Sequence, residues 1–184
     1  MLDISVTVTR RRTSRITIRI AKDGAVKVSA PRLVPRATIE KFVAEHREWI
    51  EKARQRAVRQ QAGREAFYSR LDVSTPALRK EASERLDTLV TPMVAKHSEQ
   101  MGVKPSGIGY RSSKSRWGSC NTRTRHITFS LYLLLLPNWC IEHIVVHEMA
   151  HLIEPNHSHR FYAIMDRHFP RWQEARKETR RLTS

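Results

Sequence analysis

The residues with the clearest chemical meaning form an H-E-x-x-H pattern at His147, Glu148 and His151. Side chains four positions apart lie on one face of a helix, so the two histidines can direct their imidazoles at one point. Imidazole nitrogen binds zinc at roughly 2.0–2.1 Å. Glu148 follows the first histidine, where its carboxylate can reach a zinc-bound water and act as the general base. The pattern therefore predicts a catalytic zinc site.

A third ligand is expected from the segment after the helix, because catalytic zinc usually has three protein ligands and one open position. Pro155 and Asn156 favour the end of the helix and a turn. Such a turn can bring His157 under the metal, and His159 and Glu154 are the alternatives. The spacing alone does not choose among the three.

The helix around the pattern is apolar nearly all round, which predicts that it is buried. Histidine and glutamate in a buried helix need partners, and a metal ion with its water supplies them. His143, one turn before the pattern, is interpreted as a residue on the helix surface or beside the ligands rather than as a fourth ligand. The apolar positions are Ile144, Val145, Val146, Met149, Leu152 and Ile153.

The composition predicts a basic protein with one domain, or one domain and an appendage. The 184 residues include 34 Lys and Arg against 18 Asp and Glu, a net charge of +16. Such a charge favours nucleic acid, an anionic membrane surface or acidic proteins as partners, but it also suits a basic protein with no such partner. The basic residues are scattered, with small clusters at 10–12 and 180–181.

Cysteine content and hydropathy indicate a reduced, cytoplasmic setting without a membrane span. Cys120 and Cys140 are too few for a disulfide framework, and Cys140 is expected in the core. The longest apolar run, residues 131–136, is far shorter than the ~20 residues that cross a bilayer. No apolar segment of the secretory type begins the chain.

The first part of the chain predicts a small antiparallel sheet followed by a helix. Gly24 follows Asp23 in a hairpin signal, and residues 37–63 have a helical pattern that becomes charged and should project into water. Trp49 is expected to anchor this helix in the core. The predicted strands cover residues 4–9, 15–20 and 25–30.

The second part predicts a catalytic core of helices and a small sheet. Together with the first part it gives an α+β fold, divided into residues 1–72 and residues 73–184. Thr75 and Pro76 form a helix start. The predicted elements are a helix to about residue 100, strands at 107–113 and 125–130, a helical turn at 131–136, and helices at 160–168 and after Pro170.

Two separated motifs resemble those of the YgjP-like metallopeptidases, which are relatives of the SprT-type proteases in the zincin group. The first is Lys114-Ser115-Arg116-Trp117-Gly118-Ser119-Cys120, and the second joins residues 144–152 to Asn156-His157-Ser158 and Phe161. The N-terminal part is also similar, through Ala30-Pro31, Phe42-Val43 and Trp49-Ile50. One departure is Ser130, where asparagine is expected in many relatives.

The resemblance implies that His147, His151 and His157 bind Zn²⁺ and that Glu148 is the catalytic base. It thereby favours His157 over His159. The implied activity is hydrolysis of a peptide or protein substrate by a glutamate-activated, zinc-bound water. Tyr162, His159 and Arg116 are the candidates for stabilising the oxyanion.

Two other functions remain as alternatives. A nucleic-acid-associated protein, or a protease acting on DNA-bound proteins, would use the +16 charge. A hydrolase of non-peptide substrates would use the same zinc water.

Overall fold

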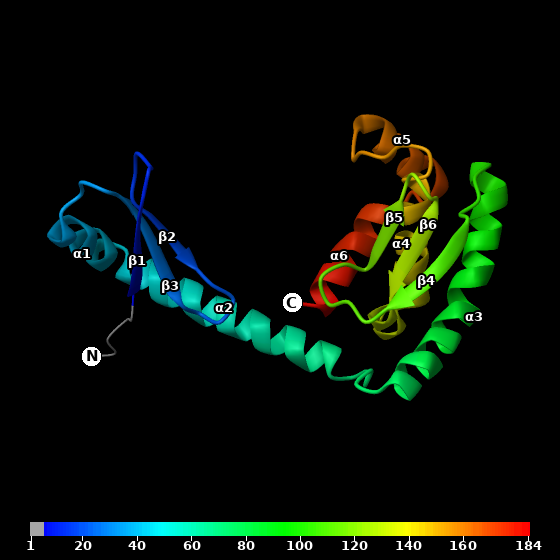
Figure 1. The fold of residues 1–184 in the computed structure, drawn as a ribbon, viewed down its shortest axis with the longest axis horizontal. Coiled ribbons are helices and arrows are strands. Elements are labelled where there is room, and N and C mark those ends of the chain that lie inside the picture. Colours follow the sequence, from blue (N-terminus) through cyan, green and yellow to red (C-terminus); the bar gives the residue numbers. More distant parts are fainter. Residues whose placement is uncertain (1–5) are drawn as a thin grey trace. The chain divides into compact units, whose positions relative to one another are not determined.

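The alternating apolar residues of the first segment form a three-stranded sheet in the computed structural model, which describes residues 6–184 (Figure 1). The strands β1 (Val6–Arg11), β2 (Thr17–Ile20) and β3 (Val26–Pro31) lie in the order β1-β3-β2. Val26 and Val28 are buried against residues of the helices that follow. Positions 4 and 5 of the first predicted strand lie outside the described residues.

The N-terminal sheet is mixed rather than antiparallel, which corrects one detail of the sequence prediction. β2 and β3 form the expected antiparallel hairpin. β1 pairs with β3 in parallel, from Val6 opposite Val26 to Arg11 opposite Pro31. Alternation of apolar residues identifies which face of a strand is buried, but it does not specify the neighbouring strand or its direction.

The predicted helix over 37–63 is two helices, α1 (Arg36–Glu45) and α2 (Arg47–Tyr68). They are separated at His46, whose Nδ1 lies 2.7 Å from the carbonyl oxygen of Phe42. The expectation that Trp49 anchors the core is wrong, since its exposed fraction is 52%. Its neighbour Ile50 is the residue packed in the core.

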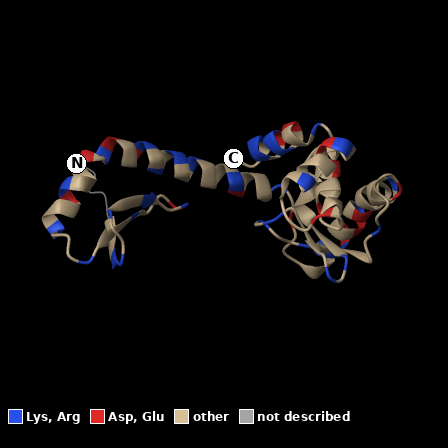
Figure 2. Cartoon of the chain, turned by 90° about the horizontal axis from the view of Figure 1, so that it is seen from above, with Lys and Arg blue, Asp and Glu red and all other residues tan. Residues whose placement is uncertain are grey.

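The chain divides into two compact units, one ending at Glu65 and the other comprising Ala66–Thr183. The division of domains after residue 72 stays a prediction from the sequence. Basic residues occur in both units, as Figure 2 shows in blue. Among the residues described, no helix is long and apolar enough to cross a lipid bilayer.

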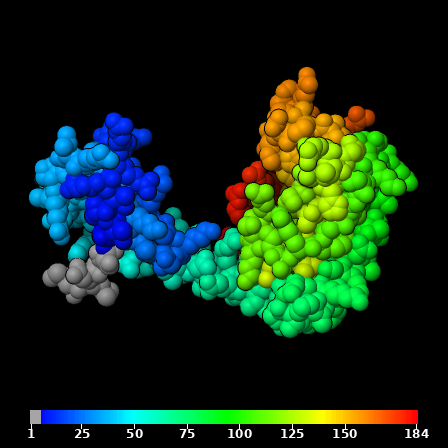
Figure 3. Space-filling model, in the orientation of Figure 1, coloured from blue at the N-terminus to red at the C-terminus, as the bar shows by residue number. Residues whose placement is uncertain are grey.

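The second unit is built from helices and a second three-stranded sheet, so the predicted α+β class is confirmed. Figure 3 shows its surface in green to red. Thr75 caps its first helix by accepting a hydrogen bond from the Leu78 amide, and Gly102 ends that helix with φ 65°. The elements are α3 (Pro76–Met101), β4 (Gly107–Arg111), β5 (Gly118–Asn121), β6 (His126–Ser130), the 3₁₀ helix η1 (Leu131–Leu135), α4 (Asn138–Ala150), α5 (His159–His168) and α6 (Trp172–Leu182).

The second sheet has the order β4-β6-β5, which leaves β5 at an edge. The sequence did not predict β5, because it is short and begins with glycine. Ser130, the departure from the family pattern, lies where β6 meets η1. Its hydroxyl donates to the Ser113 carbonyl at 2.6 Å and accepts from the Tyr132 amide.

Helix α4 is the central element of this unit. It contacts α3, α5, α6 and the edge strand β5. These neighbours explain why the helix is apolar nearly all round, since almost every face meets another element. Cys140 is buried in the same core, as expected. The polar residues of α4 are therefore held rigidly.

Candidate metal centre

Three histidine rings converge at the end of α4. One ring nitrogen of each of His147, His151 and His157 lies within 4.8 Å of the other two. His147 lies in the last turn of α4, His151 is the C-cap residue that follows this helix, and His157 comes from the loop before α5. The Nε2 atoms of His147 and His157 are 3.1 Å apart. The loop thus returns the chain to the helix face, as the sequence predicted.

The two alternative ligands are not part of this cluster. His159 begins α5 and is exposed. The Glu154 carboxylate is turned toward its own loop, where Oε1 accepts from the Asn156 amide at 3.4 Å. The Glu154 carbonyl oxygen lies 3.3 Å from Nδ1 of His151. Because a carbonyl only accepts, Nδ1 of His151 carries the proton and its Nε2 is left as the donor to a cation.

The ring of Phe161 packs against the imidazole rings of all three histidines. Its ring centroid lies 4.9 Å from that of His147, 4.6 Å from that of His151 and 4.8 Å from that of His157. Phe161 is fully buried on α5, with Val146, Ala150 and Met165 in the same cluster. The aromatic ring thereby limits the orientations that the histidines can adopt. In the sequence, Phe161 stood out only as part of the motif.

The chemistry of the cluster fits a divalent cation. Two nitrogen ligands of a tetrahedral zinc ion lie about 3.3 Å apart, close to the separation of the two Nε2 atoms. Burial, followed by the neighbouring histidines, lowers the pKa of His147 to about 3. Burial also lowers the pKa of His151. Both rings are therefore neutral near pH 7, which is the form that binds metal.

Glu148 lies beside this cluster, on the side of α4 that faces β5. Its exposed fraction is 6%, and burial raises its pKa to about 7, against the opposing effects of Arg111 and Arg116. A Cβ atom at Gly118 would lie only 2.6 Å from Cγ and Oε1 of Glu148. The edge strand can approach the carboxylate this closely only because residue 118 is glycine. In the sequence, Gly118 stood out only as part of a motif, and no local pattern of residues indicates this contact.

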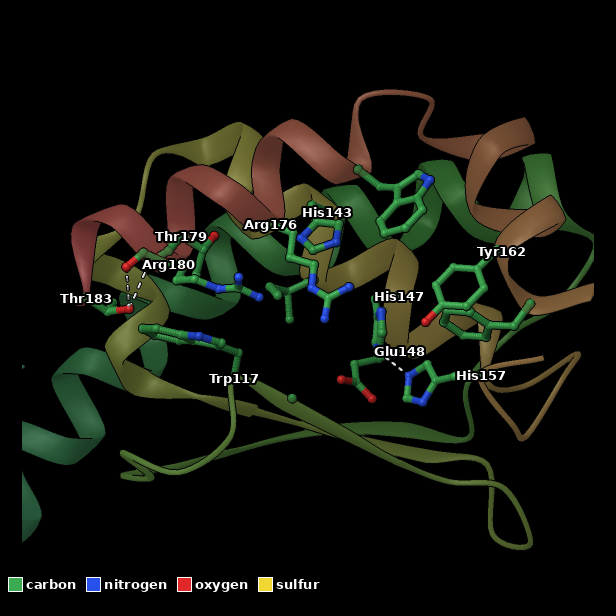
Figure 4. A pocket seen from close by; sticks show the side chains of 14 residues that line it. Trp117, His143, His147, Glu148, His157, Tyr162, Arg176, Thr179, Arg180 and Thr183 are labelled. Atoms are coloured by element: carbon green, nitrogen blue, oxygen red, sulfur yellow. Dashed lines mark hydrogen bonds between the residues drawn. The ribbon is translucent and has the colours of Figure 1, made fainter. Parts of the chain in front are cut away.

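The centre opens into a cavity of about 530 Å³ that includes His147, Glu148 and His157 in its wall (Figure 4). Of the three oxyanion candidates, Tyr162 lines this cavity, whereas His159 and Arg116 do not. Figure 4 shows the Tyr162 hydroxyl on the side of the ring that faces His147 and His157. The Tyr162 ring stacks on Trp172 of α6, with centroids 5.2 Å apart.

His143 is buried in the wall of the same cavity. Its exposed fraction is 4%, and its Nδ1 has no hydrogen-bond partner within residues 6–184. Its ring centroid is 6.1 Å from that of His147. Burial, and then the charge of Arg176, lowers the pKa of His143 to about 4. The residue lies beside the cluster of three histidines without being part of it.

Comparison with known proteins identifies the class to which this fold and site belong. The YgjP-like metallopeptidase domain matches residues 14–74 and 71–182. The chain therefore belongs to the YgjP-like family and contains its metallopeptidase domain, as the sequence motifs indicated. Membership of this family implies a bound metal ion, and the histidine cluster offers a place for it.

One solved structure is similar to this chain. It is the crystal structure of the metallopeptidase zymogen abylysin of Pyrococcus abyssi, with 22% sequence identity. The match covers 49% of this chain and 90% of the other, with a TM-score of 0.46. Comparison with curated proteins finds no match.

Proposed function

We propose that this metallopeptidase uses Zn²⁺ held by His147, His151 and His157, with Glu148 as the catalytic base. The observation that supports the proposal is the convergence of three imidazole nitrogens within 4.8 Å of one another beside a buried carboxylate. When bound, zinc supplies a Lewis acid that polarises a peptide carbonyl and lowers the pKa of water. Soft thiolates are absent from the cluster, and a set of imidazoles suits zinc.

Glu148 moves the proton in this mechanism. One of its carboxylate oxygens takes a proton from the attacking water and later passes it to the departing amine nitrogen. The carboxylate is held for this task between α4 and the backbone of β5 at Gly118. Its low exposure excludes bulk water that would otherwise exchange the proton. Tyr162 would donate its hydroxyl hydrogen to the oxygen of the tetrahedral intermediate, a role that its position in the cavity wall supports.

The edge strand β5 provides the direction in which a peptide would lie. An edge strand has backbone amide and carbonyl groups on one side that no neighbouring strand uses. An extended peptide can pair with such an edge and pass the adjacent carboxylate. We infer that the substrate binds as an additional strand along β5.

The decisive experiment compares Glu148→Gln with the parent chain. The variant should keep one equivalent of zinc but lose hydrolysis of a quenched fluorescent peptide library by at least about 10³-fold. Glu154→Gln is the matched control, because Glu154 lies near the centre but faces its own loop. Retained peptidase activity in Glu148→Gln would remove the mechanism. Turnover of esters or phosphoesters, but not of peptides, would favour a non-peptide hydrolase instead.

A second candidate function is association with nucleic acid through the N-terminal sheet. Residues opposite each other on paired strands share a face, so the outward face can be read from the strand register. Lys27 lies opposite Thr7 on one side and Arg19 on the other. The outward positions contain no acidic residue and are Thr7, Thr9, Arg11, Thr17, Arg19, Lys27, Ser29 and Pro31.

Cationic and hydroxyl side chains on an open sheet suit contacts with phosphate groups rather than with base edges. We therefore propose binding without sequence preference. Gel shifts with DNA should weaken steeply with salt, by about 0.9 in log K per log salt for each phosphate contacted. Arg19→Glu with Lys27→Glu should abolish the shift, whereas Arg36→Glu, at an arginine paired with Glu40 on α1, should not. Binding that ignores ionic strength would contradict this proposal.

A further inference from the structure

Helix α6 presents one face to the cavity of the metal centre. The α6 residues in the cavity wall are Trp172, Arg176, Thr179, Arg180 and Thr183. Their spacings of three, four and one residues follow the turn of an α-helix, so they form a continuous stripe. At a rise of 1.5 Å per residue, the stripe extends about 12 Å from Trp172 to Arg180. The stripe begins at Trp172, whose ring stacks on Tyr162, and continues to Arg176 and Arg180.

Arg176 differs from the arginines on the other faces of α6. Arg171 pairs with Glu174 at 2.9 Å, and Arg181 pairs with Glu178 at 2.7 Å. These two pairs use both glutamates of the helix. Within residues 6–184, Arg176 makes no hydrogen bond or ion pair, and Figure 4 shows its side chain directed into the cavity. Arg176 lines the same cavity as His143 and His147, which places its side chain on the side of the cavity next to the metal centre.

The other groups around Arg176 do not neutralise it. His143 cannot neutralise a guanidinium, because an imidazole carries no negative charge in either protonation state. The Thr179 hydroxyl already donates to the Ala175 carbonyl at 2.8 Å. Glu148 is the acidic residue in the cavity wall, and its interactions with cations are with Arg111 and Arg116. Arg176 therefore gives the part of the cavity along α6 a positive charge that a bound ligand can contact.

We propose that Arg176 forms a subsite that binds a carboxylate of the substrate beside the scissile bond. This inference rests on the proposed peptidase function and adds a substrate class to it. A guanidinium donates two parallel hydrogen bonds to one carboxylate, which fixes the orientation of the bound group. The carboxylate belongs either to an aspartate or glutamate side chain or to the C-terminus of the peptide. Trp172 and Trp117 provide apolar walls at the two ends of the stripe.

The first experiment measures binding without catalysis. The full chain is prepared free of metal, so that a carboxylate cannot coordinate the ion, and short peptides are titrated by calorimetry. Peptides with glutamate should bind about 10- to 100-fold more tightly than the same peptides with glutamine. Comparison of C-terminal acids with C-terminal amides distinguishes the two sources of the carboxylate. Equal binding of all four kinds of peptide would overturn the proposal.

Variants assign the preference to one side chain. Arg176→Gln should remove the difference between glutamate and glutamine peptides, and Arg176→Glu should reverse it in favour of lysine peptides. Arg181→Gln is the matched control, because that arginine lies on the same helix and is paired with Glu178. If Arg176→Gln lowers the affinity for charged and neutral peptides equally, Arg176 has a structural role and the proposal is overturned.

The second experiment tests the zinc-loaded enzyme with the same peptides. The preference should appear in the parent chain as a higher kcat/KM for glutamate peptides than for the matching glutamine peptides, and the ratio of the two values should fall to about one in Arg176→Gln. A parent chain that binds carboxylate peptides selectively but cleaves none would refute the peptidase function and leave the subsite standing. Cleavage that shows no such preference would refute the subsite and leave the peptidase function standing.

Discussion

Replacing Gly118 by alanine is expected to impair catalysis without removing the metal. The new Cβ atom would lie 2.6 Å from Cγ and Oε1 of Glu148 and 2.8 Å from its Cδ. Ordinary contacts of a Cβ atom are 3.4–4 Å. The Glu148 side chain must therefore move by about 1 Å, because van der Waals repulsion rises steeply below contact distance. The backbone of β5 needs no special conformation, since Gly118 is not among the described glycines with positive φ.

The expected loss of catalytic rate in Gly118→Ala follows from this displacement of the Glu148 side chain. Misplacing a reacting group by 1 Å costs about 10²-fold in rate, or about 2.7 kcal/mol in the activation free energy. The three atoms nearest to the new Cβ atom all belong to Glu148 and none to a histidine, so zinc content should remain at one equivalent. Overpacking of this kind typically lowers the free energy of unfolding by about 1–3 kcal/mol. The variant should still fold.

The assay combines kcat/KM on a cleaved peptide, zinc content and thermal unfolding. Gly109→Ala is the control, because it makes the same substitution in β4 of the same sheet. There the new Cβ atom would lie 2.9 Å from Nε2 of His126, whose exposed ring can turn aside. Full activity in Gly118→Ala, or an equal loss in Gly109→Ala, would refute the argument that glycine sets the position of Glu148.

Two further predictions concern the support of the metal centre. Phe161→Ala should lower the free energy of unfolding by about 3–5 kcal/mol and also weaken zinc binding. Phe129→Ala, which removes an equally buried ring from a different cluster, should affect stability alone. If the two variants have the same zinc affinity in competition with a chelator, this prediction is contradicted. In the metal-free chain, the unfolded state takes up a proton at His143 near pH 6.5 that the folded state accepts only near pH 4. The free energy of unfolding should therefore fall as the pH falls through this range, and it should fall less in His143→Leu than in the parent chain. Urea unfolding measured across this pH range tests the prediction, and identical pH profiles of the two proteins would show that His143 does not titrate in this way.

The sequence was most informative where residue spacing alone sets geometry. Positions 147 and 151 lie on one face of any α-helix, so their convergence needs no knowledge of the fold. Local signals were equally reliable at the start of α3, where Thr75 caps the helix, and at its end in Gly102. The apolar character of α4 correctly indicated a helix surrounded by other elements.

The sequence was least informative where the outcome depends on contacts between distant segments. The pairing of β1 with β3 joins segments about 20 positions apart, and alternation cannot reveal it. The short strand β5 exists because β6 pairs with it, although its own residues have weak strand propensity. Trp49 is a large aromatic residue but is exposed, whereas its neighbour Ile50 is packed in the core, because the covered side of a helix depends on the segments that pack against it.

The amino-acid sequence by itself determined the family, the metal-site motif and the elements that present it, because these depend on residue types at fixed local spacings. Only the tertiary structure decided that Gly118 touches Glu148, that Phe161 supports three imidazoles and that Arg176 enters the cavity. Each of these contacts joins segments separated along the chain. Their existence depends on how α4, α5, α6 and β5 pack together, which no local pattern of residues specifies.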